Sequence, residues 1–341
     1  MIPFILSIVS TIGLTEAQYT DSSREFDGKP RLIEVAIWYP ASPSTPTQNV
    51  EFGIWKIQDA ARNAPLYSQE KKLPLVLFSH GYSGNQWVGT WFAEYLAARG
   101  YIVAVVRHYG NSYRNMIPEL CARPWNRPQD LKFALDQLLE HPLLKEHIDT
   151  SRIGAAGFSQ GGITSMWLGG VQAALSADIL KEQITVTQNP ILQQMHFKDI
   201  PAQRPNTILD NFTQKDFDQA NQSYRDERIK AAFVIAPGID EKNVMFTKEG
   251  LSKACIPMHI QIGQAEERQA IDDASFFAQA IPHCLFTVIP GEVGHMTLLN
   301  EGTEEGKKIK PEYTVDHPSV DRAAVHAQVA ADALHFFETH L

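Results

Sequence analysis

The residues with the clearest chemical pattern lie at positions 157–161, which read Gly-Phe-Ser-Gln-Gly. This is a Gly-x-Ser-x-Gly pattern centred on Ser159, and a strand-like run over residues 151–158 leads into it. Between a strand and a helix, the glycines permit a sharp turn that exposes the serine hydroxyl and points a helix N-terminus at the group it attacks. Ser159 is therefore predicted to be the nucleophile of an acyl-transfer reaction.

His295 is the candidate base for this serine. A serine hydroxyl needs a histidine to take its proton and an acid to fix the tautomer of that histidine, and with this turn the chain order is serine, acid, histidine. His295 ends the stretch Gly-Glu-Val-Gly-His just beyond the apolar run 285–289, and a loop at the carboxyl end of a strand can reach the nucleophile. His259 lies within a predicted strand and is expected to be structural.

The acid has more than one candidate. Glu266 is the first choice because it follows the apolar run 256–262 by a few residues, and Asp240, beyond the preceding apolar run, is the alternative. Glu267 is the third choice. A structural explanation also exists for the two glutamates, because negative charge favours the N-terminus of a helix predicted from residue 268.

The negative charge that develops in acyl transfer needs preorganised hydrogen-bond donors. After the apolar run 73–79, residues 80–84 read His-Gly-Tyr-Ser-Gly, which is typical of a turn that lends a backbone amide to an oxyanion hole. The amides of Tyr82 and Gln160 are the candidate donors. His80 is expected to brace the turn.

The elements that must position these residues follow an alternating pattern. Short apolar runs suit parallel strands covered on both faces, and they occur at residues 75–78, 101–106, 153–158, 231–236, 258–262 and 285–289. Helical patterns lie between or after them at residues 87–99, 129–140, 161–175, 268–280 and 319–340. Residues 31–40 alternate as a half-buried antiparallel strand does. The expected fold class is α/β, with a doubly wound, mostly parallel sheet and antiparallel N-terminal strands.

One interruption of this pattern predicts an inserted segment. Residues 170–228 are polar, rich in Gln, Asn and Asp, and contain three prolines over 190–205. A long segment of this kind inside a compact domain usually has a function. We therefore expect one domain over residues 25–341 with a helical cap inserted at about 170–228.

The N-terminal segment, residues 1–24, has two interpretations. Its apolar stretch resembles the core of a secretory signal, but no basic residue precedes Arg24, so a first β-strand is the alternative. The localisation accordingly stays open between an exported and a cytoplasmic protein. The apolar stretch is too short for a membrane span.

The composition limits the classes of molecule that this chain is expected to bind. The net charge of −9 argues against nucleic acid, whose phosphates attract a basic face. Three scattered cysteines, Cys121, Cys255 and Cys284, are too few for a disulfide framework or a metal cage and are expected to be buried free thiols, with a Cys255–Cys284 bridge as the alternative. A monomer is favoured.

These motifs together resemble the α/β-hydrolase superfamily, and within it the platelet-activating-factor acetylhydrolase and predicted dienelactone hydrolase group. The narrower resemblance rests on blocks at residues 34–40, 78–84, 108–111, 125–131 and 149–162. It covers most of residues 30–165, with thinner support over 229–300. The sequence departs from this group in two ways. Enzymes named dienelactone hydrolase carry cysteine where this chain has Ser159, and members usually carry aspartate where it has Glu266.

The resemblance implies a serine hydrolase that cleaves carboxylic esters of small molecules or lipids through a Ser-acid-His triad, with no metal or organic cofactor. Two alternatives remain at this stage. The first is an amidase or peptidase on the same scaffold, and the second is a catalytically silent binding protein of the same fold.

Overall fold

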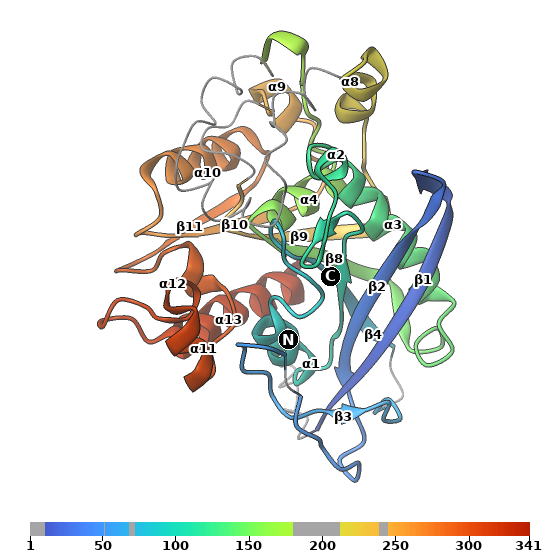
Figure 1. Cartoon of the computed structure of the whole chain (residues 1–341), viewed down its shortest axis with the longest axis vertical. Coiled ribbons are helices and arrows are strands. Elements are labelled where there is room, and N and C mark those ends of the chain that lie inside the picture. The colour runs from blue at the N-terminus through green and yellow to red at the C-terminus, as the bar shows by residue number, and fades with distance from the viewer. Residues whose placement is uncertain (1–10, 51, 68–71, 180–211, 239–244) are drawn as a thin grey trace.

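The computed structural model of the chain describes residues 11–50, 52–67, 72–179, 212–238 and 245–341, and the statements below concern these residues. They form a nine-stranded sheet with helices packed on it and a separate two-stranded ribbon (Figure 1). The strand order in the sheet is β11-β10-β9-β8-β4-β5-β2-β1-β3. The strands are β1 (Ile12–Phe26), β2 (Lys29–Pro40), β3 (Ala61–Arg62), β4 (Leu73–Ser79), β5 (Ile102–Arg107), β6 (Asn111–Ser112), β7 (Asn115–Met116), β8 (Ile148–Phe158), β9 (Ile229–Ile235), β10 (Met258–Gly263) and β11 (Leu285–Ile289).

The helices follow the strands as a doubly wound fold requires. They are α1 (Thr90–Ala97), α2 (Pro118–Cys121), α3 (Asn126–Leu139), α4 (Gln160–Leu168), α8 (Gln214–Asn221), α9 (Lys248–Leu251), α10 (Arg268–Ala280), η1 (His295–Leu298), α11 (Glu304–Ile309), α12 (Pro311–Thr314) and α13 (Arg322–His340). In the part of the sheet that runs from β11 to β5 in spatial order, each strand is parallel to its neighbours. β2 pairs antiparallel with β5, and β1 pairs antiparallel with β2. The predicted fold class is confirmed.

The N-terminal strands form a long hairpin. Asp27 and Gly28 both have positive φ, 52° and 68°, which is the geometry of a tight turn that matches the right-handed twist of the flanking strands. The register runs from Phe26↔Lys29 to Ile12↔Pro40, with an irregularity between Asp21 and Glu25. Residues 12–24 are thus part of β1, and residues 1–10 lie outside the described residues.

Helices cover both faces of the sheet. Adjacent residues of a strand point to opposite faces. In β9, the ring of Phe233 lies 6.4 Å from that of Phe337 of α13, while the next residue, Val234, lies against Gly162 of α4. Helices α4 and α13 therefore pack on opposite faces.

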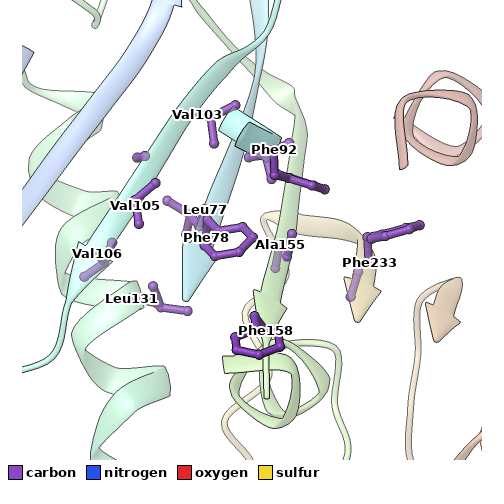
Figure 2. Close-up of a cluster of buried hydrophobic side chains, with 14 of the residues drawn as sticks. Leu77, Phe78, Phe92, Val103, Val105, Val106, Leu131, Ala155, Phe158 and Phe233 are labelled. Atoms are coloured by element: carbon purple, nitrogen blue, oxygen red, sulfur yellow. The ribbon is translucent and has the colours of Figure 1, made fainter. Parts of the chain in front are cut away.

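The core fills the space between the sheet and these helices. Phe78 of β4 contacts Phe92 of α1 with ring centroids 5.3 Å apart, and Figure 2 shows them among the aliphatic side chains of β5 and the ring of Phe158. These side chains are buried. Burial of a side chain of this size contributes about 1.5–3 kcal/mol. The buried apolar strands therefore also fix the positions of the loops that follow them.

Some predicted boundaries are wrong for identifiable reasons. The helix predicted over residues 161–175 ends at Leu168, because Gly169 and Gly170 follow and Gly170 has a φ of 106°. The last helix begins at Arg322 rather than at residue 319, because the Asp321 carboxylate accepts a hydrogen bond from the Ala324 amide and so caps it there.

The central part of the predicted cap, residues 180–211, lies outside the described residues. The C-terminal edge of the segment is described. It includes α8, whose first turn is closed by a capping box between Thr213 and Asp216. The Asn221 side chain bonds the backbone of Leu175 at both its N–H (2.6 Å) and its carbonyl (2.9 Å), so the two edges of the segment are tied together. The cap itself stays a prediction.

The cysteines and the helices bear on two further expectations. Cys121, Cys255 and Cys284 are free thiols, so the alternative of a Cys255–Cys284 bridge is wrong. The expectation that the thiols would be buried is also wrong, because Cys255 is exposed and Cys121 and Cys284 are only partly buried. Among the described residues, no helix is both long enough and apolar enough to cross a membrane.

A buried ion pair joins the hairpin to α3. The Arg31 guanidinium of β2 donates two hydrogen bonds of 3.1 Å to the Asp130 carboxylate, which also lies 2.9 Å from Arg24. Burial alone would raise the pKa of Asp130, but Arg31, Arg24 and a hydrogen bond from His108 hold it well below its ordinary value. The folded state therefore depends on an ionised Asp130.

We predict that Asp130→Asn lowers the free energy of unfolding by about 3–5 kcal/mol, because it leaves the buried Arg31 guanidinium without its counter-charge, whereas Arg24 keeps its pair with Asp21. Because the folded pKa is depressed, the stabilisation from Asp130 is present above the unfolded pKa of about 4 and decreases as the pH falls below it. Urea denaturation at several pH values measures both effects. Asp136→Asn, at an exposed position of the same helix, is the control and should cost less than about 1 kcal/mol. Equal losses from the two variants would contradict the prediction.

Candidate active site

Ser159 lies at the turn between β8 and α4 with φ 56° and ψ −122°. A non-glycine residue with positive φ is uncommon and persists only where its surroundings hold it. Here the Ser159 N–H donates to the carbonyl of Ile235 (2.9 Å), and the Ser159 carbonyl accepts from the Gly162 amide (2.9 Å). The backbone thus holds the strained turn from both sides, with the side chain half-buried at the end of the sheet.

The glycines on either side of the serine are required by close backbone contacts. A Cβ at Gly157 would lie 2.2 Å from the carbonyl oxygen of Gly161. A Cβ at Gly161 would lie 1.8 Å from the carbonyl oxygen of Ser79, the last residue of β4. The first turn of α4 can therefore approach the end of β4 only because these residues lack side chains.

His295 and Glu266 form a hydrogen-bonded pair next to this turn. His295 begins η1 after β11, and Glu266 follows β10, the neighbouring strand. His295 Nδ1 lies 2.9 Å from Glu266 Oε1, and the imidazole packs on Phe158, the residue before the serine, at 4.7 Å between ring centroids. The Glu266 side chain is only 5% exposed against 32% for the imidazole. The buried glutamate carboxylate therefore fixes the orientation of the more exposed imidazole.

The pair also determines the tautomer of the imidazole. An ionised carboxylate accepts hydrogen bonds only, so Nδ1 carries the proton and donates it to Glu266. This leaves Nε2 as an acceptor, the form that a general base needs.

The other acid candidates lie elsewhere. Asp240 is outside the described residues. Glu267 occupies the N-cap position of α10, which is the structural role considered for it from the sequence.

Helix α13 and the segment before it anchor the loop that carries His295. His326 of α13 is stacked on Trp91, and its Nε2 lies 2.8 Å from the carbonyl oxygen of Thr297. The Thr297 hydroxyl donates to Asp316 (2.8 Å), and Asp316 pairs with Arg322 at 2.7 Å. The sequence does not indicate this contact of His326, because its partner Thr297 lies 29 residues away along the chain.

The predicted oxyanion-hole segments meet at the serine. A Cβ on Gly81 would lie 3.2 Å from Ser159 Cβ, so the loop of residues 80–84 borders the nucleophile. Tyr82 belongs to this loop. Gln160 is the first residue of α4, and amides in the first turn of a helix have no acceptor within the helix.

A buried polar network lies beneath this loop. His80 Nε2 accepts from the His108 amide (3.2 Å), so its Nδ1 carries the proton that bonds the Gly81 carbonyl (2.7 Å). Burial, with a further effect from Arg127, holds the pKa of His80 well below its ordinary value, so His80 is neutral and braces the loop. His108 binds Asp130 through Nδ1 (3.1 Å), and burial lowers the pKa of His108 to about 3.

Arg127 and Asp130 are not among the site residues predicted from the sequence, although both belong to this network. A signal was present, because both are charged residues on the same helical stripe as the buried Leu131, Ala134 and Leu138. Charge on an apolar stripe indicates a buried polar contact.

No group of three or more His, Cys, Asp or Glu side chains within the described part of the chain is arranged to hold a metal ion.

Comparison with known proteins gives three kinds of similarity. Residues 49–117 match the family described as platelet-activating factor acetylhydrolase, isoform II. A protein of Bacillus subtilis, "Putative esterase YitV", is 29% identical over 133 residues, which cover 36% of this chain and 48% of that protein. Dipeptidyl-peptidase 5 of Porphyromonas gingivalis is 28% identical over 120 residues, covering 31% of this chain and 16% of that protein. The matched parts thus span about half or less of these relatives.

Solved structures show the same fold. A ferulic acid esterase from Streptomyces cinnamoneus has a TM-score of 0.62 at 20% identity, covering 97% of this chain and 90% of that one. A protein from Bacteroides ovatus described as a dipeptidyl aminopeptidase IV has a TM-score of 0.50 at 12% identity, covering 96% of this chain and 36% of that one. The shared arrangement is the α/β-hydrolase fold.

We predict that Gly161→Ala destabilises the protein by about 3 kcal/mol or prevents folding, because the added methyl group would overlap the carbonyl of Ser79. Urea denaturation followed by tryptophan fluorescence measures the loss. Gly238→Ala is the matched control, since a Cβ there meets no described atom within 4 Å, and it should change stability by less than about 0.5 kcal/mol. A Gly161→Ala protein as stable as wild type would show that the close approach does not constrain the turn.

Proposed function

We propose that this chain, which belongs to the α/β-hydrolase superfamily and resembles the platelet-activating-factor acetylhydrolase and dienelactone hydrolase kind, is a serine hydrolase that cleaves carboxylic esters. The observation that carries the proposal is the His295–Glu266 pair, 2.9 Å apart, packed against the residue that precedes Ser159. Three chain segments distant in sequence meet there in the order serine, acid, histidine.

The first half of the reaction forms an acyl-enzyme. Ser159 Oγ attacks the ester carbonyl carbon while His295 Nε2 takes the hydroxyl proton. The carbonyl oxygen becomes negative and accepts hydrogen bonds from the Tyr82 and Gln160 amides. The tetrahedral intermediate then releases the alcohol, to which His295 returns the proton.

The second half repeats these steps with water. His295 Nε2 takes a proton from water, whose oxygen attacks the acyl carbon, and the same two amides stabilise the new oxyanion. When the intermediate breaks down, Ser159 Oγ leaves with the proton from His295, and a carboxylic acid is released. The Glu266 carboxylate stabilises the imidazolium in both halves and keeps Nδ1 protonated. Every step uses only side chains, backbone amides and water.

The similarity to an esterase from Bacillus subtilis and the structural likeness to a ferulic acid esterase support ester cleavage. The substrate class we propose is therefore small-molecule or lipid carboxylic esters. The sequence similarity to a dipeptidyl-peptidase keeps an amidase or peptidase as the second candidate. Turnover of p-nitrophenyl acetate against that of a p-nitroanilide separates the two, because only an amidase should cleave the anilide at a comparable rate.

We predict that Ser159→Ala lowers kcat/KM for p-nitrophenyl acetate by at least about 10³-fold, because it removes the nucleophile. A fluorophosphonate probe should label the wild-type protein and fail to label this variant. Ser151→Ala, at the opposite end of β8, is the matched control and should keep wild-type activity and labelling. Folded wild-type protein that resists the probe and leaves the ester intact would instead favour a catalytically silent binding protein.

We predict that Glu266→Gln lowers kcat by about 10³–10⁴-fold, because an amide that donates to Nδ1 favours the wrong tautomer of His295. Asp240→Asn, tested in parallel, should change kcat less than about threefold. Steady-state kinetics on p-nitrophenyl acetate, with circular dichroism as the check on folding, compares the two. A large loss from Asp240→Asn together with an active Glu266→Gln would transfer the acid role to Asp240.

A further inference from the structure

We propose that Arg127 is the positioning residue of the oxyanion hole, because its buried guanidinium binds both chain segments that supply the oxyanion donors. This inference rests on the proposed function, since it concerns the geometry of Tyr82 and Gln160. Arg127 lies near the start of α3 and is 1% exposed, so it does not touch bulk solvent.

The contacts of Arg127 divide between the two segments. Nη1 donates to the Gln160 side-chain oxygen at 2.6 Å. Nη2 donates to the carbonyl oxygen of His80, and the carbonyl oxygen of Gly81 lies 3.5 Å from the same nitrogen. One end of the guanidinium therefore holds the first residue of α4, and the other holds the loop after β4.

Peptide geometry connects these contacts to the first donor. In a trans peptide the carbonyl and the following N–H point in opposite directions. The Gly81 carbonyl faces the buried network, where the His80 ring (2.7 Å) and the Gly84 amide (3.2 Å) also bind it. The Tyr82 N–H belongs to the same peptide unit, so it points away from Arg127. A rotation of this peptide would remove the donor from the site.

The second donor is held through a side chain. The Gln160 side-chain oxygen accepts from both Arg127 and the Asn111 amide group (3.1 Å). Gln160 is 3% exposed, and its backbone amide is the proposed donor. Fixing the side chain on the inner side of the helix restricts the rotation of the first turn of α4, and hence the direction of that amide.

An arginine suits this position for a geometric reason. Its planar guanidinium presents two nitrogens in fixed directions, so it can bind two acceptors on separate segments at once, whereas a lysine ammonium is a single charged point. Burial lowers the pKa of Arg127 to about 9, an effect that Asp130 opposes, so the group stays charged at neutral pH. A charged donor holds carbonyl oxygens more strongly than a neutral one.

The experiment compares four variants with wild-type protein on p-nitrophenyl acetate. Arg127→Met removes the hydrogen bonds to Gln160 and to the His80 carbonyl. Arg127→Lys keeps the charge but not the two nitrogens in fixed directions, and Gln160→Met removes the acceptor on α4. Arg228→Met is the control, since Arg228 pairs with Asp226 and Asp136 at the start of β9, the end of the sheet opposite Ser159. Fluorophosphonate titration counts active sites, so that kcat is expressed per functional site and a smaller folded fraction does not affect it.

We expect kcat per titrated site to fall by about 10²-fold in Arg127→Met and about tenfold in Arg127→Lys and Gln160→Met, because donors to the oxyanion act in the transition state. KM should change less than about threefold. The inhibition constant of phenylboronic acid, which forms a tetrahedral adduct with the serine, should rise in parallel with the loss of kcat/KM. Arg228→Met should keep kcat and boronate binding within about twofold.

The outcomes separate the two proposals. Wild-type protein that neither turns over the ester nor reacts with the probe overturns the proposed function and this inference with it. An active wild type with Arg127→Lys and Gln160→Met both within threefold in kcat overturns the inference alone, whether or not Arg127→Met folds. A loss confined to the number of titrated sites, with kcat per site and boronate affinity unchanged, shows that Arg127 only stabilises the fold.

Discussion

The close approach between the first turn of α4 and the end of β4 is the constraint on which the site depends. At Gly161 the two backbones leave no room for a side chain, since a Cβ would lie 1.8 Å from the Ser79 carbonyl. This contact sets the angle of α4, imposes positive φ on Ser159 and brings the loop after β4 beside the serine. The proposed nucleophile and the proposed oxyanion-hole segments are therefore positioned by one packing contact, between α4, which follows β8, and the end of the adjacent strand β4.

The proposed base and its proposed acid come from a different part of the sheet and rely on different forces. His295 follows β11, the edge strand of the described sheet, and Glu266 follows β10, the strand beside it. The loop of His295 is held by side chains instead: His326 and Asp316 both bind Thr297, two residues beyond the base. The proposed triad thus joins a rigid turn at the centre of the sheet to a loop that α13 and Asp316 hold in place.

What the sequence could predict follows from how local each signal is. The parallel strands were predictable because each is a short apolar run. The placement of Ser159 and His295 just beyond strand ends was predictable because glycines mark those turns within a few residues. The helix over 161–175 was predicted too long, because apolar residues continue past Leu168 while Gly170 ends the helix through its φ. The links from Arg127 to the Gln160 side chain and to the His80 carbonyl span 33 and 47 residues, and no local pattern encodes such pairings.

The buried charges of Arg127 and Asp130 suggest a reason for the contacts between residues that are distant in sequence. Burying an ion pair costs desolvation that its attraction barely repays, and apolar residues of similar volume would often stabilise a core as well or better. Arg127 and Asp130 are nonetheless completely enclosed, and through His108, His80 and the carbonyls of the loop they reach the proposed oxyanion donors. Hydrogen bonds in a charged network are directional, whereas apolar packing is not. A hydrogen bond to the carbonyl of a peptide fixes the orientation of that peptide, and the amide of the same peptide then points to the opposite side. The placement of Arg127 therefore favours a role in the geometry of the proposed site, whereas Asp130 also stabilises the fold through its pair with Arg31.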